Sequence, residues 1–295
     1  MLKKIAVILE MIKFSHTIFA LPFALVSACL ASKREAGWRW LDLIGILVCM
    51  VFARSAAMAF NRWADQSIDA ANPRTKIRAI PAGLLTSGQV LLFVIACTLG
   101  FVAATTIFWF SSGNWWPTLL SVPVLAYLMG YSYAKRFTPF AHVWLGAALA
   151  LSPIAAWIAI RPIVEPPPFL LAAVILFWVT GFDILYACQD LEVDRKLGLH
   201  SIPARLGIAG AFWVSRVCHL LTLVALAAFG RLTPELDAFF WIGYALIAIL
   251  LIVEHWLVRN RDLGRINLAF FHVNGVISMA ILLVTLADLY FPLRS

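Results

Sequence analysis

Apolar runs long enough to cross a lipid bilayer recur along the whole chain of 295 residues. A membrane-spanning helix needs about 20 predominantly apolar residues. Segments that meet this requirement cover residues 16–32, 41–60, 89–110, 115–132, 141–160, 169–188, 212–230, 239–258 and 267–289. Since backbone polar groups in lipid must be satisfied internally, runs of this length favour helices over a closed barrel. The pattern predicts an all-α polytopic membrane protein with nine transmembrane helices.

The composition excludes two broad classes of protein. Hydrophobic residues make up 63% of the chain and charged residues 13%, against about 45–50% and about 25% in soluble domains. A soluble globule would lack polar residues to cover its surface, and a disordered chain would not carry so much apolar area. The net charge is +8, but the basic residues are spread between apolar runs. We therefore expect a lipid bilayer as partner and no nucleic acid.

The distribution of Lys and Arg predicts the orientation of the chain. With nine spans, the N-terminus shares one side of the membrane with the loops that follow the even-numbered spans, and most loop Lys and Arg residues lie on that side. Cytoplasmic loops carry such an excess. We expect one domain over residues 1–295 in a bacterial-type inner membrane, with the N-terminus and two long connections, 61–88 and 189–211, in the cytoplasm.

A first group of polar residues lies at the cytoplasmic end of the second predicted span. Asn61, Asp65 and Asp69 follow one another at intervals of four, so on a helix they project from one face. Arg54 precedes Asn61 by seven residues and lies inside the apolar run. An intramembrane Arg is costly unless it faces a polar cavity or a partner. This helix is predicted to carry an Arg deep in the membrane and carboxylates near its rim.

A second group follows the sixth predicted span and repeats this layout. Asp190 and Asp194 are again four apart, and Asp183 lies seven residues before Asp190, inside the apolar run with Tyr186 near it. One acidic cluster at a membrane rim is usually a solvated loop. Two matched pairs on the same side, each with a charged residue upstream inside the span, favour a functional site.

Clustered carboxylates repel one another, and protonation or a divalent cation relieves that repulsion. Mg²⁺ favours a few carboxylates together with water and phosphate oxygens. Basic groups suited to phosphate follow the acidic pairs and the fourth span. They are Arg74, Arg78, Lys135 and Arg136, with Tyr131 four residues before Lys135. These residues predict Mg²⁺ that bridges the carboxylates to a diphosphate.

Three motifs together resemble the signatures of the UbiA-type intramembrane prenyltransferases. They are Asn61-x-x-x-Asp65-x-x-x-Asp69 with Asn72-Pro73-Arg74-Thr75 and Arg78 after it, Tyr131-x-x-x-Lys135-Arg136, and Asp183-x-x-Tyr186-x-x-Gln189-Asp190-x-x-x-Asp194. The resemblance covers nearly the whole chain. The sequence departs from it at Arg62, where many members carry an Asp.

This resemblance implies an activity and a set of roles. The family transfers a polyprenyl chain from its diphosphate to an acceptor, often an aromatic ring, in a cavity between nine helices that opens to the cytoplasm. The implied metal residues, which hold Mg²⁺, are Asp65, Asp69, Asp190 and Asp194. The implied diphosphate-binding residues are Asn61, Arg74, Arg78, Tyr131, Lys135 and Arg136. The implied catalytic residues are Asp190, Asp183 and Arg54, with Arg54 placed to hold an acceptor carboxylate.

Several alternatives remain open on the sequence alone. We expect an aromatic acid acceptor of quinone biosynthesis, 4-hydroxybenzoate, with a dihydroxynaphthoate as the alternative. Haem, chlorophyll precursors and glycerol phosphates are acceptors of other members. From a different class, a cation- or proton-coupled transporter would use Asp183 and Arg54 as relay residues. Acidic pairs on one rim argue against a transporter, because a path across the membrane needs polar residues on both sides.

Overall fold

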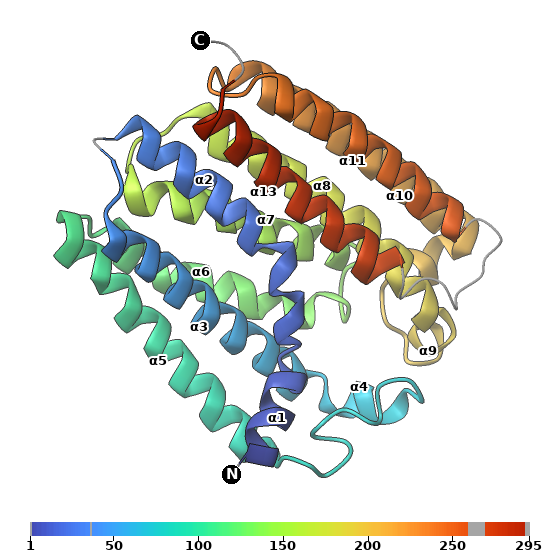
Figure 1. Ribbon diagram of the computed structural model, residues 1–295. Coiled ribbons are helices and arrows are strands. Elements are labelled where there is room, and N and C mark those ends of the chain that lie inside the picture. Colours follow the sequence, from blue (N-terminus) through green and yellow to red (C-terminus); the bar gives the residue numbers. More distant parts are fainter. Residues whose placement is uncertain (1, 36, 259–268, 293–295) are drawn as a thin grey trace. The chain divides into compact units, whose positions relative to one another are not determined.

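The computed structural model describes residues 2–35, 37–258 and 269–292. Over these ranges every regular element is a helix and none is a strand, so the all-α prediction is confirmed (Figure 1). The elements are α1 (Leu2–Met11), η1 (Phe14–Phe19), α2 (Leu21–Arg34), α3 (Trp40–Ala64), α4 (Gln66–Ala71), α5 (Ser87–Ser112), α6 (Trp116–Ala134), α7 (Ala141–Ile160), α8 (Pro166–Ala187), η2 (Cys188–Asp190), α9 (Leu191–Lys196), α10 (Ile202–Leu232), α11 (Ala238–Leu257), the π-helix η4 (Ala269–Val273) and α13 (Asn274–Tyr290).

In the described part of the chain, 7 helices are long and apolar enough to cross a membrane. They are α3, α5, α7, α8 with its continuation into α9, α10, α11 and the segment Phe270–Tyr290. The predicted spans 16–32 and 115–132 are also helical, as α2 and α6, but neither is among the 7. α2 has 14 residues, which is short for a bilayer, whereas α6 has 19 residues and runs unbroken through Pro123. Residues 267 and 268 of the last predicted span lie outside the described residues. The count of nine spans stays a prediction.

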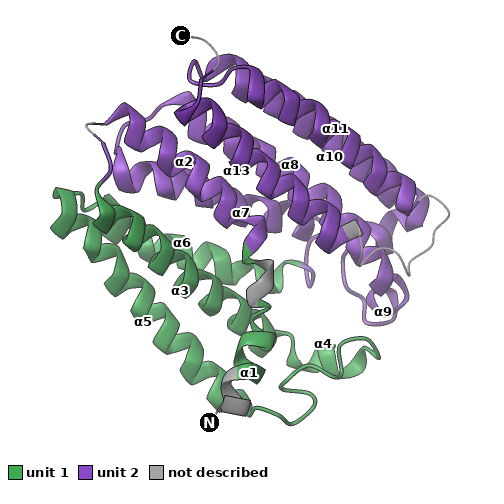
Figure 2. Cartoon of the chain, viewed as in Figure 1, with its two compact units in different colours: residues 1–17, 39–134 green, residues 18–38, 135–295 purple. Residues whose placement is uncertain are grey.

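The chain forms two compact units, coloured separately in Figure 2. Unit 1 comprises residues 1–17 and 39–134 and holds α1, α3, α4, α5 and α6. In it α3 packs closely on α5, because glycines face aromatic rings. A Cβ added to Gly45 would lie 2.8 Å from Phe108 Cζ, and one added to Gly100 would lie 2.6 Å from Phe52 Cε1. Close helix approach of this kind is typical of membrane bundles.

Unit 2 comprises residues 18–38 and 135–295 and is built around α8, which packs against α7 and α10. The α8 side chains Leu171, Ile175 and Trp178 are fully buried. A Cβ added to Gly146 of α7 would lie 2.4 Å from the carbonyl oxygen of Leu176. The interior of this unit therefore depends on α8 being enclosed by its neighbours.

At one end of unit 2, ion pairs connect the turns between its helices. Arg34, at the end of α2, forms ion pairs with Glu165 and with Glu235, the latter at 2.6 Å. Arg161 pairs with Glu165 and with Glu35, each at 2.7 Å. Burial alone would raise the pKa of Glu165, but hydrogen bonds from Arg161 and Arg34 outweigh it and hold that pKa below its usual value. These pairs join α2 to the α7–α8 and α10–α11 turns.

Short helices occupy the two long connections that were predicted to face the cytoplasm. α4 lies within 61–88, and Thr86 and Gln89 form a capping box that starts α5. η2 and α9 lie within 189–211, and Ser201 caps α10 by accepting from the N–H of Ala204 at 3.2 Å. Gly207, with φ 69° and ψ 178°, then breaks the regular path of α10, a conformation that favours glycine.

Candidate active site

The first acidic motif does not lie on one continuous helix. α3 ends at Ala64, Asp65 forms the junction with φ −96° and ψ 11°, and Asp69 lies in α4. The i to i−4 backbone bonds persist across the junction, from Asp65 N–H to Asn61 O at 3.0 Å and from Asp69 N–H to Asp65 O at 2.8 Å. The prediction of a single helical face is corrected to a helix, a junction and a short helix. Asp favours such boundaries because its short side chain competes for local hydrogen bonds.

Within this motif Asp69 is buried, with an exposed fraction of 4%, and is only half satisfied. Arg78 donates from Nη1 to Asp69 Oδ1 at 2.6 Å, while Asp69 Oδ2 is buried without a hydrogen-bond partner in the described part of the chain. The hydroxyl of Thr75 donates to the carbonyl of Asp69 at 3.1 Å. The turn after α4 thus brings Arg78 back to Asp69.

Arg62, the position at which the sequence departs from the resemblance, is central to this motif. The side chain is buried and donates to Asn61 Oδ1 at 3.1 Å and to the carbonyl of Met11 at 3.4 Å. Its charge interacts with nearby charged and phenolic groups. These are Arg78, Asp69, Asp65 and Tyr131. Sequence reasoning gave Arg62 no role. Its position as a basic residue between Asn61 and two acids is the signal that could have indicated a role in this motif.

Arg54 lies on α3 before these residues. Its Nη2 donates to the carbonyl of Lys13 at 3.1 Å, and its Nε is buried with no hydrogen-bond partner among the described residues. An N–H of a guanidinium that has no partner can donate to a carboxylate or another oxygen that reaches it. The predicted intramembrane cation is therefore held by the chain through Nη2 and retains an unpartnered Nε.

The second acidic motif repeats the first in local geometry. α8 ends at Ala187, Asp190 lies at the junction with φ −101° and ψ 4°, and Asp194 lies in α9. Asp194 is 3% exposed. Its Oδ2 is 3.8 Å from Nζ of Lys135 and has no hydrogen-bond partner in the described residues. The predicted single helical layout of these acids is corrected likewise, because Asp183 lies in α8, Asp190 ends η2 and Asp194 lies in α9.

The basic motif is divided between the two units. Tyr131 belongs to unit 1 with the first acidic motif, whereas Lys135 and Arg136 belong to unit 2 with the second. The backbone N–H of His200 donates to the carbonyl of Lys135 at 2.7 Å. Together with the contact between Lys135 and Asp194, this bond docks the turn after α9 on the basic motif. Within unit 2, the structure therefore brings Lys135 and Asp194 together.

Asp183 has a partner that sequence reasoning missed. Nδ1 of His142 on α7 is 2.7 Å from Asp183 Oδ2. The six histidines of the chain have no spacing typical of metal ligands, and nothing in the sequence ties His142 to Asp183. Only the packing of α7 on α8 brings them together.

Aromatic rings line α8 beside Asp183. The ring of Phe270 lies 4.4 Å from that of Tyr186 and 5.3 Å from that of Phe182, measured between centroids. Phe182 also contacts Trp178 at 5.1 Å and Phe19 at 5.6 Å. Aromatic faces attract cations and are apolar, so such a cluster suits a positively charged carbon or a hydrocarbon chain.

The carboxylate oxygens of the two acidic motifs suit a hard divalent cation, but they do not form a complete metal site by themselves. Among the described residues no three His, Cys, Asp or Glu side chains converge as metal ligands. Each acidic motif nevertheless leaves one buried carboxylate oxygen unsatisfied, Oδ2 of Asp69 and Oδ2 of Asp194. Such oxygens are costly unless a cation or a donor meets them, and Mg²⁺ takes few protein carboxylates with phosphate oxygens. The residues present therefore fit Mg²⁺ bound together with a phosphate ligand.

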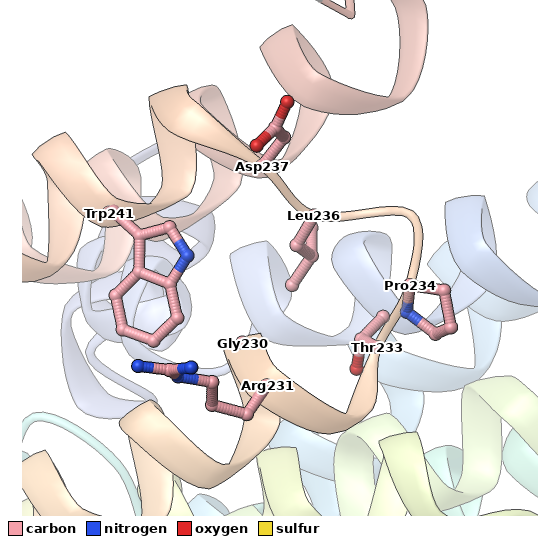
Figure 3. A pocket seen from close by; sticks show the side chains of 7 residues that line it. All are labelled: Gly230, Arg231, Thr233, Pro234, Leu236, Asp237 and Trp241. Atoms are coloured by element: carbon pink, nitrogen blue, oxygen red, sulfur yellow. The ribbon is translucent and has the colours of Figure 1, made fainter. Parts of the chain in front are cut away.

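A pocket of about 440 Å³ lies at the turn between α10 and α11, in unit 2 (Figure 3). Arg231 there lies 5.4 Å from the ring centroid of Trp241. None of its lining residues belongs to the motifs described above. A second hollow of about 570 Å³, lined by Trp109, Trp115, Thr118 and Leu119, also lacks predicted site residues. The candidate site is therefore defined by the motifs and their contacts.

Comparisons with known proteins agree with each other. The family model described as the UbiA prenyltransferase family matches residues 20–276. The 4-hydroxybenzoate octaprenyltransferase of Nitrosomonas eutropha is 33% identical over 251 residues, which is 83% of this chain and 84% of that protein. The enzyme of the same name from Xanthomonas oryzae is 31% identical over 228 residues, or 76% of this chain and 72% of that protein.

Solved structures show the same fold. The apo structure of a UbiA homolog from Aeropyrum pernix K1 has a TM-score of 0.82 and 31% identity, and the match covers 92% of this chain and 98% of that one. A UbiA homolog from Archaeoglobus fulgidus, bound to DMAPP and Mg²⁺, has a TM-score of 0.73 at 16% identity, with 96% and 99% of the two chains covered.

Proposed function

The chain belongs to the UbiA prenyltransferase family, and we propose that it transfers a polyprenyl chain from polyprenyl diphosphate to 4-hydroxybenzoate. Family membership and relatives named 4-hydroxybenzoate octaprenyltransferase make it an aromatic polyprenyltransferase. They also remove the transporter alternative. The acceptor, the metal and the residue roles belong to the proposal.

The observation that carries the proposal is the unsatisfied carboxylate oxygen in each acidic motif, next to a cation. Asp69 Oδ2 accompanies the Asp69–Arg78 pair, and Asp194 Oδ2 faces Lys135. We assign Mg²⁺ to the carboxylates of both motifs, Asp65, Asp69, Asp190 and Asp194. Bound Mg²⁺ would supply positive charge that stabilises a diphosphate leaving group. Each motif is described within its own unit, so the joint role of the four rests on the sequence and on this chemistry.

The basic and amide groups contribute binding of the diphosphate. Arg forks match phosphate oxygens and a Lys ammonium acts as a point charge. The proposed donors are Asn61, Arg74, Arg78, Tyr131, Lys135 and Arg136. Positive charge held in place before the reaction favours the state in which negative charge develops on the leaving group.

The proposed transfer conserves atoms and electrons. The allylic C–O bond breaks and its electron pair leaves with the diphosphate. A ring carbon of the acceptor forms the new C–C bond, and the acceptor loses one proton. The aromatic cluster of Phe19, Trp178, Phe182, Tyr186 and Phe270 would shelter the allylic cation from water. Asp183 and Asp190 are the proposed proton acceptors.

Arg54 supports an acceptor that carries a carboxylate, since its buried Nε lacks a partner among the described residues. 4-Hydroxybenzoate and dihydroxynaphthoates both carry this group, and Arg54 does not choose between them. The names of the relatives favour the benzoate. Ubiquinone biosynthesis is then the proposed pathway, with menaquinone biosynthesis as the alternative.

We propose a bacterial-type inner membrane as the location, with the N-terminus and both motif loops in the cytoplasm, and residues 1–295 as one prenyltransferase domain. The apolar helices and the bacterial relatives support the membrane, and the distribution of Lys and Arg supports the orientation. A cavity that opens to the cytoplasm is part of the same proposal.

The test is an assay of the purified protein in detergent with Mg²⁺, geranyl diphosphate and a panel of hydroxybenzoates and hydroxynaphthoates. We expect prenylated 4-hydroxybenzoate and released diphosphate, and neither product after Asp65→Ala or Asp190→Ala. Asp42→Asn is the matched control, because Asp42 is buried and paired with Arg39 outside the motifs. Wild-type rates in either alanine variant would overturn the roles of these carboxylates. A preference for a naphthoate would overturn the acceptor.

A further inference from the structure

His142 joins three segments of unit 2. The residue lies on α7 and is fully buried, with an exposed fraction of 0%. Its Nδ1 is 2.7 Å from Asp183 Oδ2 on α8. The backbone N–H of Ile202, the first residue of α10, donates to its Nε2 over a long 3.5 Å. The imidazole therefore connects Asp183 to the start of α10, directly after the turn that follows α9.

These contacts assign the proton on the imidazole ring. A backbone N–H can only donate, so Nε2 of His142 must present its lone pair to Ile202. The ring proton then lies on Nδ1 and is donated to Asp183 Oδ2. A doubly protonated ring would turn an N–H toward the N–H of Ile202. In this arrangement His142 is thus a neutral hydrogen-bond donor, and its proton is assigned to Nδ1 from the contacts of the ring.

A neutral donor orients a carboxylate without cancelling its charge. The side chain of Asp183 is 17% exposed, so it is not sealed in the interior. The contact with His142 involves Oδ2 and not Oδ1. His142 therefore fixes one oxygen of Asp183, and Oδ1 is the oxygen that it leaves to accept a proton.

From this geometry we propose that His142 is a positioning residue, which holds Asp183 as the anionic proton acceptor of prenyl transfer. The inference rests on the proposed function. In that reaction the acceptor loses one proton as the C–C bond forms. The proton moves to Asp183 Oδ1 and then to water, while the C–O electron pair leaves with the diphosphate. Groups that hydrogen-bond to metal ligands and orient them commonly contribute about 10- to 100-fold to activity, and we expect an effect of the same size for a group that orients a carboxylate base.

A purely structural histidine would behave differently on substitution. Its loss would lower stability, and the surviving folded enzyme would keep its kcat. Asn is the informative replacement, because its amide nitrogen lies as many bonds from Cβ as Nδ1 of His. His142→Asn keeps a donor for Asp183, whereas His142→Ala removes it.

The kinetic test compares these two variants with wild type at saturating Mg²⁺. We expect His142→Ala to lower kcat about 10- to 100-fold with little change in KM for geranyl diphosphate, and His142→Asn to recover most of that loss. Asp288→Asn is the control, because Asp288 is buried and accepts from the N–H groups of Asp237, Phe239 and Phe240 at the start of α11. That variant should lose thermal stability and keep kcat. Equal kcat in wild type and His142→Ala, or no recovery by Asn, would overturn the proposal.

A spectroscopic test separates this inference from the proposed function. Nitrogen-15 NMR of histidine-labelled protein in detergent, at neutral pH, reports which ring nitrogen carries the proton. His142→Asn identifies the signal by its loss. We expect a neutral ring protonated at Nδ1, altered by Asp183→Ala. A ring protonated at Nε2 or at both nitrogens would refute the dyad even in an active enzyme. Absence of prenyl transfer to every aromatic acid would instead refute the proposed function.

Discussion

Asp65 and Asp190 adopt the same backbone conformation, with φ and ψ of −96° and 11° in one and −101° and 4° in the other. Asp65 directly follows the long helix α3, and Asp190 ends the 3-10 helix η2 that continues α8. Each precedes a helix of 6 residues, α4 or α9, whose fourth residue is a buried acid. That acid, Asp69 or Asp194, has an unsatisfied Oδ2 in both cases. Two segments distant in sequence thus build one local structure, which supports equivalent roles for the two motifs.

Removal of the charge of Asp194 should lower the rate of prenyl transfer without lowering the thermal stability of the protein. Asp194→Asn keeps the size of the side chain and removes a buried carboxylate that lacks a hydrogen-bond partner at Oδ2. We expect the rate of prenyl transfer to fall by about 100-fold, the usual scale for loss of one electrostatic contact to a reacting group. The melting temperature should stay the same or rise, because Lys135 at 3.8 Å only partly compensates this buried charge. Assays over a range of Mg²⁺ concentrations and thermal unfolding in detergent measure both. A large fall in melting temperature would contradict this account.

Arg54 should act on the acceptor and not on the prenyl diphosphate. Arg54→Lys keeps the charge and loses the planar fork that suits a carboxylate. We expect KM for 4-hydroxybenzoate to rise about 10-fold, equivalent to about 1.4 kcal/mol, with KM for geranyl diphosphate unchanged. The methyl ester of the acceptor provides the control. The ester should be a poor acceptor for wild type and should lose nothing further in the variant. An equal penalty on acid and ester would show that Arg54 does not bind the carboxylate.

The ion pairs at the turns of unit 2 predict how stability depends on pH. The pKa values of Glu165 and Glu235 lie below their usual value of about 4.5 because hydrogen bonds from Arg161 and Arg34 outweigh the effect of burial. A depressed carboxylate pKa stabilises the folded state above the unfolded pKa, and this contribution is lost as pH falls through the folded one. We expect the melting temperature to fall below about pH 4.5.

Glu165→Gln is the variant that tests this dependence. It should lower stability at neutral pH by about 1 kcal/mol or less, the usual scale for partly solvated pairs. It should also weaken the dependence on acid pH. An unchanged acid profile in Glu165→Gln would show that this carboxylate does not contribute to it.

Helix packing in unit 2 can be tested at a glycine. In Gly146→Ala the new Cβ would lie 2.4 Å from the carbonyl oxygen of Leu176 and 2.6 Å from Oγ1 of Thr180. Because backbone on α8 must move, we expect a cost of about 1–3 kcal/mol. Gly88→Ala is the matched control, since an added Cβ there meets nothing within 4 Å. It should leave stability unchanged or raise it by up to about 1 kcal/mol. Equal melting temperatures for the two variants would contradict close α7–α8 packing.

The sequence was sufficient for the fold class and the family, and for part of the site. Apolar length alone predicts the long helices. The motifs group Asp69 with Arg78 and Asp194 with Lys135, and the two residues of each pair are in contact. The family model confirms the resemblance carried by the motifs. Spacing of four could not reveal the junctions, because the i to i−4 bonds continue through Asp65 and a short 3-10 helix leads through Asp190.

The contacts that the sequence did not reveal depend on packing between helices. His142 meets Asp183 across two helices that are neighbours only in the folded chain. Arg62 is buried against Met11 and Asn61, whereas a basic residue at the end of a predicted span is normally assigned to solvent. Such contacts follow from side chains on separate segments, and periodicity within one segment carries no information about them.

The ion-paired turns of unit 2 predict which end of this unit undergoes local opening more easily. Ion pairs of Arg34 and Arg161 join several elements at one end of the unit, and Asp288 of α13 accepts there from an N–H at the start of α11. The other end, where α9 meets α10, consists of short helical turns and the non-helical Gly207. Amide deuterium uptake should therefore be slow around residues 233–240 and fast around 195–207, and entry or exit of reactants would be accommodated at that faster end.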